Sequence, residues 1–149
     1  MQLNASTCYA LQITLYLSKN NRIVSSTELS EKLHISPRYI SHIASKLRDG
    51  ALIGTHAGMS GGYVLNKDVS AISVYDVVVL MEGDMSIPEC VRPCKNASLH
   101  DALSVLKDYF DTYFKTITFN ILADMEITGK LSEIITMVET HIVAMKQKN

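Results

Sequence analysis

The sequence has no tryptophan, and it has only three prolines and three cysteines among its 149 residues. Three cysteines cannot all pair, so we expect reduced thiols, metal ligands or switchable groups rather than a disulfide framework. No run of 18 uncharged apolar residues occurs, and the first residues lack the basic flank and cleavage site of a signal peptide. These absences predict a cytoplasmic protein that does not contact a membrane.

The net charge of −1 conceals an uneven distribution of charge along the chain. Residues 1–67 carry seven lysines and arginines against three acidic residues, a net charge of +4, whereas the remainder carries seven against twelve, a net charge of −5. A positive segment can bind phosphates by counterion release while a negative segment stays clear of the nucleic acid. The apolar content of 47% is sufficient for one compact domain with an assembly element.

The first third of the chain shows the signals of three helices. Apolar residues near helical spacing predict a helix over 5–19 that ends at the polar pair Asn20-Asn21. Ser25, with Glu28 three residues later, predicts a capping box at the start of a second, short helix. Ser36-Pro37 supplies an N-cap and a proline at the first position of a third helix. The second and third helices are three residues apart, which is typical of a helix-turn-helix.

The third helix is expected to have two different faces. The apolar face carries Ile40, Ile43, Ala44 and Leu47, and the opposite face carries Arg38, Ser41, His42, Ser45 and Lys46. Gly50 ends this helix, and a glycine-rich stretch over 55–62 leads to the strand-like Tyr63-Val64-Leu65. A β-hairpin directly after a helix pair is a wing. The predicted fold class is therefore mainly α with a small β-hairpin wing, a winged helix-turn-helix with a long dimerisation helix.

The second half of the chain is predicted to be helical on both sides of a loop. Residues 73–81 are expected to form a short helix that stops near Gly83, whereas Pro93 excludes a regular helix around the two cysteines that flank it. A long amphipathic helix is expected over 98–124, with a capping-box-like start at Ser98 and Asp101 and a length of roughly 40 Å. Its apolar stripe needs a partner, and a second copy of the chain is the natural one.

A last amphipathic helix is expected from its apolar residues Leu131, Ile134, Ile135, Val138, Ile142 and Met145. We therefore expect a winged helix-turn-helix DNA-binding domain over 1–67. A linker helix and cysteine-bearing sensor loop should occupy 68–97, and the dimerisation helix and C-terminal helix should occupy 98–149.

The winged helix-turn-helix predicts a protein that binds double-stranded DNA, with the N-terminal half of the third helix in the major groove and Lys46 and Arg48 on the backbone. The predicted DNA-binding residues are Ser36, Arg38, Tyr39, Ser41, His42, Lys46, Arg48, His56, Ser60 and Gly61. In the alternative interpretation these residues are a solvated face and the chain is a protein-interaction adaptor. An enzyme is not expected, because the sequence shows no catalytic triad, paired catalytic carboxylates or phosphate-binding glycine loop.

Four stretches of the sequence resemble the Rrf2 family of regulators: YALQITLYL, ELSEKLHISPRYISHIASKLRDGALI, the wing GMSGGYVLNKD, and SVYDVVVLMEG before a cysteine-bearing loop. The family includes iron–sulfur, nitric-oxide, cysteine-metabolism and thiol-stress sensors. The resemblance implies a homodimer whose long helices pair, with each winged domain reading half of a palindromic operator. A wing arginine that some relatives place in the minor groove is Ala57 here, beside His56, so operator preference does not carry over.

The cysteines leave three hypotheses open. Cys90 and Cys94 lie where cluster-binding relatives keep three cysteines, so an iron–sulfur cluster or other metal would have to draw on these two together with His100 and Cys8. A reversible thiol switch would instead form a Cys90–Cys94 bridge or a bond from the loop to Cys8. The third hypothesis treats the loop cysteines as incidental and Cys8 as a buried apolar residue, which is favoured for Cys8 alone. The working hypothesis is a repressor controlled by oxidation of Cys90 and Cys94.

Overall fold

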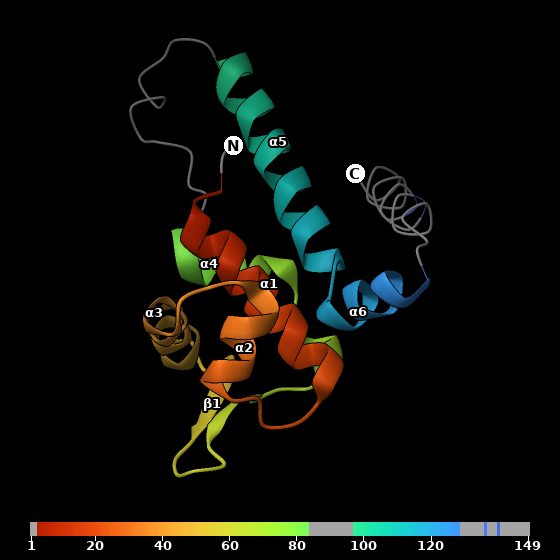
Figure 1. The fold of residues 1–149 in the computed structure, drawn as a ribbon. Coiled ribbons are helices and arrows are strands. Elements are labelled where there is room, and N and C mark those ends of the chain that lie inside the picture. The colour runs from red at the N-terminus through yellow and green to blue at the C-terminus, as the bar shows by residue number, and fades with distance from the viewer. Residues whose placement is uncertain (1–2, 84–96, 129–135, 137–139, 141–149) are drawn as a thin grey trace.

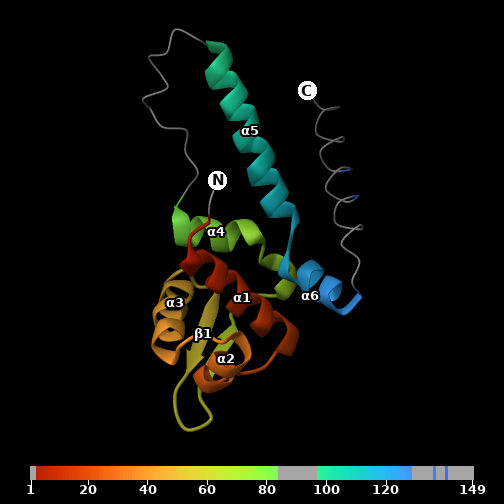
Figure 2. The ribbon, with the colours of Figure 1, turned by 45° about the horizontal axis from the view of Figure 1, so that its top comes forward.

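The structure, a computed structural model, describes residues 3–83, 97–128, 136 and 140. Its elements are α1 (Ala5–Asn20), α2 (Ser26–Leu33), α3 (Pro37–Asp49), β1 (Ile53–His56), β2 (Gly62–Leu65), the 3-10 helix η1 (Val69–Ala71), α4 (Val74–Glu82), α5 (Ala97–Thr116) and α6 (Phe119–Thr128). The first four α-helices gather with the hairpin into one body, and α5 extends away from it (Figures 1 and 2). The predicted mainly helical fold with a hairpin wing is confirmed.

Local capping chemistry sets the ends of α1. The side chain of Asn4 accepts a hydrogen bond from the Thr7 amide (2.9 Å), which satisfies a free amide of the first turn. At the other end Asn21 adopts a left-handed conformation with φ 42°, and its amide bonds the Leu17 carbonyl. The predicted helix and its polar C-terminus are therefore confirmed. None of the described helices is both long and apolar enough to cross a membrane.

The capping boxes differ from the prediction. Ser25 does accept from the Glu28 amide (3.1 Å), but the Glu28 carboxylate bonds Arg22 and Tyr16 instead of returning to the Ser25 amide. Only half of the predicted box is present, because a charged partner outside the helix binds the carboxylate. A complete box, which the sequence reading missed, opens α4 between Ser73 and Asp76.

One hydrophobic core unites the helices and the hairpin. All four residues predicted for the inward face of α3 are buried, and they lie in a cluster that also includes Ile13, Leu17, Leu29 and Ile53. The same cluster takes Val77 from α4 and Phe119 from α6. Helix α3 and the wing therefore share their support with the elements that follow them in the sequence.

The wing is tied to the helix-turn-helix by backbone pairing. Strands β1 and β2 pair antiparallel, with Ile53 opposite Leu65 and His56 opposite Gly62. The amide of Val24, just before α2, donates to the Tyr63 carbonyl (2.9 Å), and the Tyr63 amide donates back to Val24 (2.8 Å). These two hydrogen bonds hold β2 at a fixed position beside the segment that joins α1 to α2.

The prediction of a single helix over 98–124 is wrong. The helix begins at Ala97 and ends at Thr116, and a second helix, α6, begins at Phe119. Between them, the Ile117 carbonyl accepts from the Val74 amide (2.8 Å) and the Phe119 amide donates to the Ile72 carbonyl (2.9 Å). Phe119 is fully buried. This long-range pairing takes backbone groups that a continuous helix would need, so the chain turns here and α6 packs against α1.

Some of the predictions concern residues outside the described part of the chain. They include the loop with Cys90 and Cys94 and the last amphipathic helix from Leu131 to Met145. The side chains of Ser98 and His100 also lie outside it, so the capping-box-like start of α5 stays a prediction.

Gly62, the first residue of β2 after the turn of the wing, provides a test of this packing. A Cβ atom on Gly62 would stand 2.2 Å from the Val24 carbonyl oxygen, which the strand pairing holds in place. We expect Gly62→Ala to lower the free energy of unfolding by about 1–3 kcal/mol, measured by urea denaturation. The matched control Gly54→Ala brings its methyl against the Asn66 side-chain oxygen, which can rotate away, so the loss should be smaller. Equal losses in the two variants would contradict this account of the wing.

Candidate nucleic-acid interface

The turn between α2 and α3 sets the direction of α3. His34 ends α2 with a left-handed φ of 55°, and Ile35 is buried. Ser30 donates a hydrogen bond to the Ile35 carbonyl (2.7 Å). Ser36 then caps α3, with Pro37 at its first turn, as the sequence predicted. The turn is thus fixed by its own hydrogen bond and one apolar anchor, and α3 lies at the surface (Figure 1).

The exposed face of α3 presents a stripe of cationic and polar groups. Arg38, His42 and Lys46 are exposed at intervals of four residues, so they follow one another along one side of the helix. Ser36 and Ser41 are exposed beside them, and the Ser41 hydroxyl donates to the Pro37 carbonyl (3.0 Å). No acidic residue interrupts the helix before Asp49. The structure thus brings together five of the predicted DNA-binding residues.

Tyr39 lies differently from its neighbours. It is half-buried, and a hydrogen bond of 2.6 Å joins its hydroxyl to that of Ser6 on α1. Its ring makes a T-shaped contact with the Tyr9 ring at a centroid distance of 5.6 Å and stacks on His42 at 6.2 Å. The sequence marked Tyr39 as a DNA contact, whereas the structure directs its hydroxyl toward α1.

Arg48, the last basic residue of α3, is exposed but not isolated. Its guanidinium donates to the Ser45 hydroxyl (3.0 Å) and lies 3.5 Å from the Asp49 carboxylate. An exposed pair of this kind is weak, about 0–1 kcal/mol, so the guanidinium can turn to a phosphate at small cost. Arg48 remains a candidate backbone contact.

The wing tip carries an exposed methionine, Met59, which the sequence did not indicate. Gly58 has φ 105° and its carbonyl accepts from the Gly61 amide (3.0 Å), which closes the turn between the strands. His56 and Ser60 are exposed, as predicted for groups that face DNA, and Met59 between them is fully exposed. The hairpin projects from the body near α3 (Figure 2). The high exposure of a methionine could not be read from composition alone, because methionines are usually buried.

Arg22 is engaged near the start of α2, which reduces the free positive charge counted from the sequence. The Arg22 guanidinium donates two hydrogen bonds to Glu28, at 2.6 and 3.0 Å, and the Tyr16 hydroxyl donates a third at 2.9 Å. The Arg22 hydrogen bonds, followed by that of Tyr16, hold the pKa of the Glu28 carboxyl below its usual value. The lowered pKa favours the ionised form of Glu28, and the positive charge of Arg22 neutralises it.

A second carboxylate anchors the start of α1. Glu82, the last residue of α4, accepts hydrogen bonds from the Thr7 hydroxyl (2.5 Å), the Asn4 amide (3.0 Å) and the Asn4 side chain (2.9 Å). The Thr7 hydrogen bond and the Asn4 amide lower the pKa of Glu82. The first turn of α1 is thus fastened to the end of α4.

Cys8 contradicts one of the predictions. It is exposed on α1, whereas the sequence favoured a buried apolar residue. The reason is that α1 carries apolar residues on several sides, so their spacing does not identify the one open position. Within the described residues, no three histidine, cysteine, aspartate or glutamate side chains are grouped for a metal ion.

A recognition-type helix after a tight turn, followed by a two-stranded hairpin on the same body, defines a winged helix-turn-helix. The model of the Rrf2 family, described as iron-dependent transcriptional regulators, matches residues 3–125. The chain belongs to the Rrf2 family.

Named relatives agree with this assignment. The chain is 35% identical over 85 residues to the Lactococcus lactis protein YffB, whose name describes an HTH-type transcriptional regulator, and 30% identical over 92 residues to the HTH-type transcriptional regulator IscR of Escherichia coli. These matches cover 56% and 60% of the chain, and 54% and 57% of the relatives. The chain thus spans little more than half the length of these relatives, which are named as regulators and not as enzymes.

Solved structures show the same fold. CymR of B. subtilis, titled a global cysteine regulator, superimposes with a TM-score of 0.76 at 24% identity, over 83% of this chain and 97% of that one. IscR of T. potens gives a TM-score of 0.69 at 19% identity, over 83% of this chain and 87% of that one. The winged-helix fold class is therefore shown independently of the family match.

Proposed function

We propose that the chain is a transcription repressor that binds a palindromic DNA operator as a homodimer, with the N-terminal half of α3 in the major groove. The observation that carries this proposal is the exposed stripe of Arg38, His42 and Lys46, which no acidic residue interrupts. The backbone pairing of Val24 with Tyr63 ties the wing to the same body. A helix with a cationic exposed face and a buried apolar face that fixes its position is suited to enter a groove about 12 Å wide.

The residues of the stripe are suited to different parts of the duplex. Arg38 lies in the first turn of α3, where a guanidinium can donate two hydrogen bonds to a guanine edge. His42 lies one turn further along the same side, where its imidazole can reach an adjacent base. Lys46, in the last turn, is better placed for the phosphate backbone, which gives affinity without sequence information.

The wing extends this surface to a second groove. His56 and Ser60 are exposed on either side of the tip, and residues 57–60 are all exposed. Backbone amides and a hydroxyl can bind phosphates, and an imidazole can enter a narrow minor groove. Ala57 removes the long cation that some relatives use there, so the wing is expected to contribute less sequence discrimination than α3.

The first test separates base contacts from phosphate contacts. A DNA site selected from a random duplex library should lose affinity for Arg38→Ala by roughly 5- to 150-fold, because one bidentate base contact is worth about 1–3 kcal/mol. Lys46→Ala should weaken selected and random duplexes alike and reduce the salt slope by about 1. Lys115→Ala, which removes the same charge from α5, is the control and should change neither.

Fluorescence anisotropy across a range of salt concentrations measures both effects. An affinity that does not depend on salt, or a library that yields no preferred site, would favour the protein-interaction adaptor.

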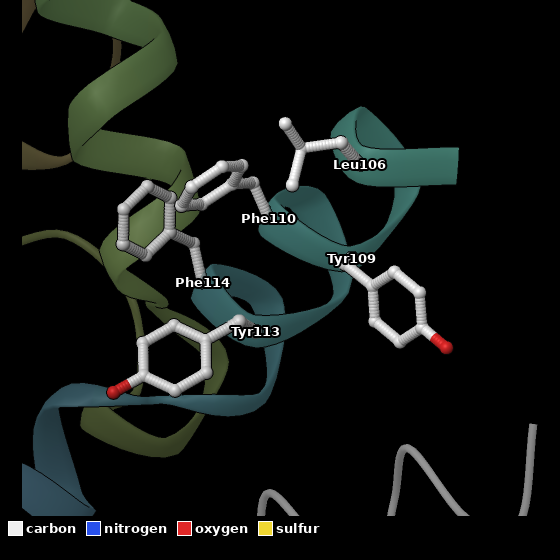
Figure 3. A pocket seen from close by; sticks show the side chains of 5 residues that line it. All are labelled: Leu106, Tyr109, Phe110, Tyr113 and Phe114. Atoms are coloured by element: carbon white, nitrogen blue, oxygen red, sulfur yellow. The ribbon is translucent and has the colours of Figure 1, made fainter. Parts of the chain in front are cut away.

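The homodimer is proposed to form along α5. Leu106, Phe110 and Tyr113 are large apolar residues that remain exposed on this helix, and Val105 beside them is 54% exposed. Figure 3 shows the pocket that Leu106, Phe110 and Phe114 line with Tyr109 and Tyr113, with the two phenylalanine rings side by side. Exposed apolar surface of this kind marks an interaction site, and two-fold pairing of identical helices would cover it.

The oligomeric state tests this face directly. Wild-type protein should show twice the 16.5 kDa mass of one chain by multi-angle light scattering, and Leu106→Glu should shift the population to monomer at micromolar concentration. Ile23→Glu is the matched control, because Ile23 is an exposed apolar residue (39%) on another part of the molecule. A dimer that survives Leu106→Glu, or one that Ile23→Glu also breaks, would place the interface elsewhere.

We further propose that oxidation of Cys90 and Cys94 controls operator affinity. Support comes from connectivity: the segment that carries both cysteines joins α4, which packs on α1 and α3, to α5. An iron–sulfur cluster is the second candidate, favoured by the iron-dependent description of the family. In the described part of the chain, however, Cys8 does not belong to any group of three or more metal-ligating side chains.

The thiol switch and the iron–sulfur cluster predict different experimental results. Cys90→Ser together with Cys94→Ser should leave binding to the selected DNA unchanged in reductant but abolish its response to hydrogen peroxide. Protein purified without oxygen should be colourless if the thiols act alone, whereas visible charge-transfer bands with bound iron and sulfide would support the cluster. An oxidant response that persists in the double variant would refute control by these cysteines.

A further inference from the structure

The contact between the first turns of α1 and α3 includes a polar pair at the edge of the apolar core. The hydroxyls of Ser6 and Tyr39 are joined by a hydrogen bond of 2.6 Å, and the Tyr39 ring makes a T-shaped contact with Tyr9, one turn further along α1. A phenol with its hydroxyl bonded and its ring packed loses most of its rotational freedom. Tyr39 therefore has a fixed position before any DNA arrives.

The Tyr39 ring also contacts His42 on the exposed face of α3. His42 is exposed, and its ring stacks on the Tyr39 ring with a centroid distance of 6.2 Å and an interplanar angle of 26°. Exposed side chains of α3 otherwise lose rotamer freedom on binding, at about 0.5–1.5 kcal/mol each. A ring held in place by its stacking partner avoids part of that loss.

The first turn of α1, which carries Ser6, is itself held from the other side. Glu82 accepts three hydrogen bonds from Asn4 and Thr7, and Thr7 is fully buried. Glu82 ends α4, and the sequence continues from it toward the segment with Cys90 and Cys94. A continuous set of contacts thus runs from the end of α4 through the start of α1 to Tyr39 and His42.

We propose that Tyr39 is a positioning residue for DNA reading: Ser6 fixes its hydroxyl, Tyr39 orients the His42 ring, and Glu82 holds the turn that carries Ser6. This inference rests on the proposed DNA-binding function and deepens it. It assigns Tyr39 an action through His42 rather than a base contact of its own, and it gives the end of α4 a physical route to the reading helix.

Ser6→Ala is the discriminating variant, because it removes the partner of Tyr39 without touching α3. Ser6→Ala and Tyr39→Phe should each lower affinity for the selected DNA by about three- to tenfold, the range expected for one lost hydrogen bond, and leave affinity for random duplex unchanged. The double variant should lose no more than either single one, since both remove the same interaction. Ser6→Thr keeps a hydroxyl and should restore the affinity.

Tyr75→Phe on α4 is the matched control, since it removes a phenol oxygen away from this contact, and it should change neither affinity. If Ser6→Ala binds the selected DNA as tightly as wild type, Tyr39 acts alone and the inference is overturned. Equal losses on selected and random duplex would also overturn it, because they would indicate general destabilisation.

Hydrogen exchange on the free protein tests the same contact without DNA. Amides of the first two turns of α3, such as Ile40, whose amide bonds the Ser36 carbonyl at 3.0 Å, should exchange two- to tenfold faster in Ser6→Ala and Tyr39→Phe but not in Tyr75→Phe. Glu82→Gln should raise the same rates, because an amide cannot accept all three hydrogen bonds.

Unchanged rates in Ser6→Ala and Tyr39→Phe would overturn the inference whatever the DNA results. Failure of wild type to select any DNA would instead overturn the proposed function, and the exchange rates would still decide whether Ser6 and Glu82 hold α3.

Discussion

Burial of α1 on nearly every side is the constraint on which the rest of the structure depends. This helix contacts α2, α3, α4, α6 and β2. Its fully buried positions include polar ones: the Thr14 hydroxyl is satisfied within the helix by the Ala10 carbonyl (2.8 Å), so it can be enclosed without an outside partner. Because these elements all pack on α1, a movement of one of them relative to another changes its contact with α1. This helix is therefore the common support of α3, the wing and the elements that follow them.

The division between polar and apolar contacts on α1 has a functional meaning. Apolar packing around Ile13 and Leu17 is non-directional, so it keeps the elements close together without fixing their relative orientation. The contacts at the first turn, where Ser6 meets Tyr39 and Thr7 meets Glu82, are directional and fix orientation. Helix α3 is thus held by the core and aligned by a few hydrogen bonds. If α3 binds DNA as proposed, those bonds are where a modest energetic change would alter recognition without unfolding the protein.

The sequence predicted those parts of the fold that local chemistry determines. Ser36-Pro37 and the glycine-rich tip gave α3 and the wing because caps, prolines and glycines act within a few residues. The end of α5 could not be predicted, since it depends on pairing of residues 117–119 with residues 72–74, some 45 positions away in the chain. The hydrogen bond between Tyr39 and Ser6 could not be predicted for a similar reason: it depends on which residue another helix brings next to the tyrosine hydroxyl.

The joint between α5 and α6 has a geometric consequence. The 20 residues of α5 make a rod of about 30 Å whose base is fixed where Val74 and Phe119 exchange backbone hydrogen bonds with Ile117 and Ile72. A tilt of about 5° at that base displaces the far end by roughly 2.6 Å, about three quarters of the 3.4 Å rise of one base pair. In the proposed dimer joined along α5, a small change in the angle of this joint would therefore change the spacing of the two α3 helices relative to the turns of a double helix.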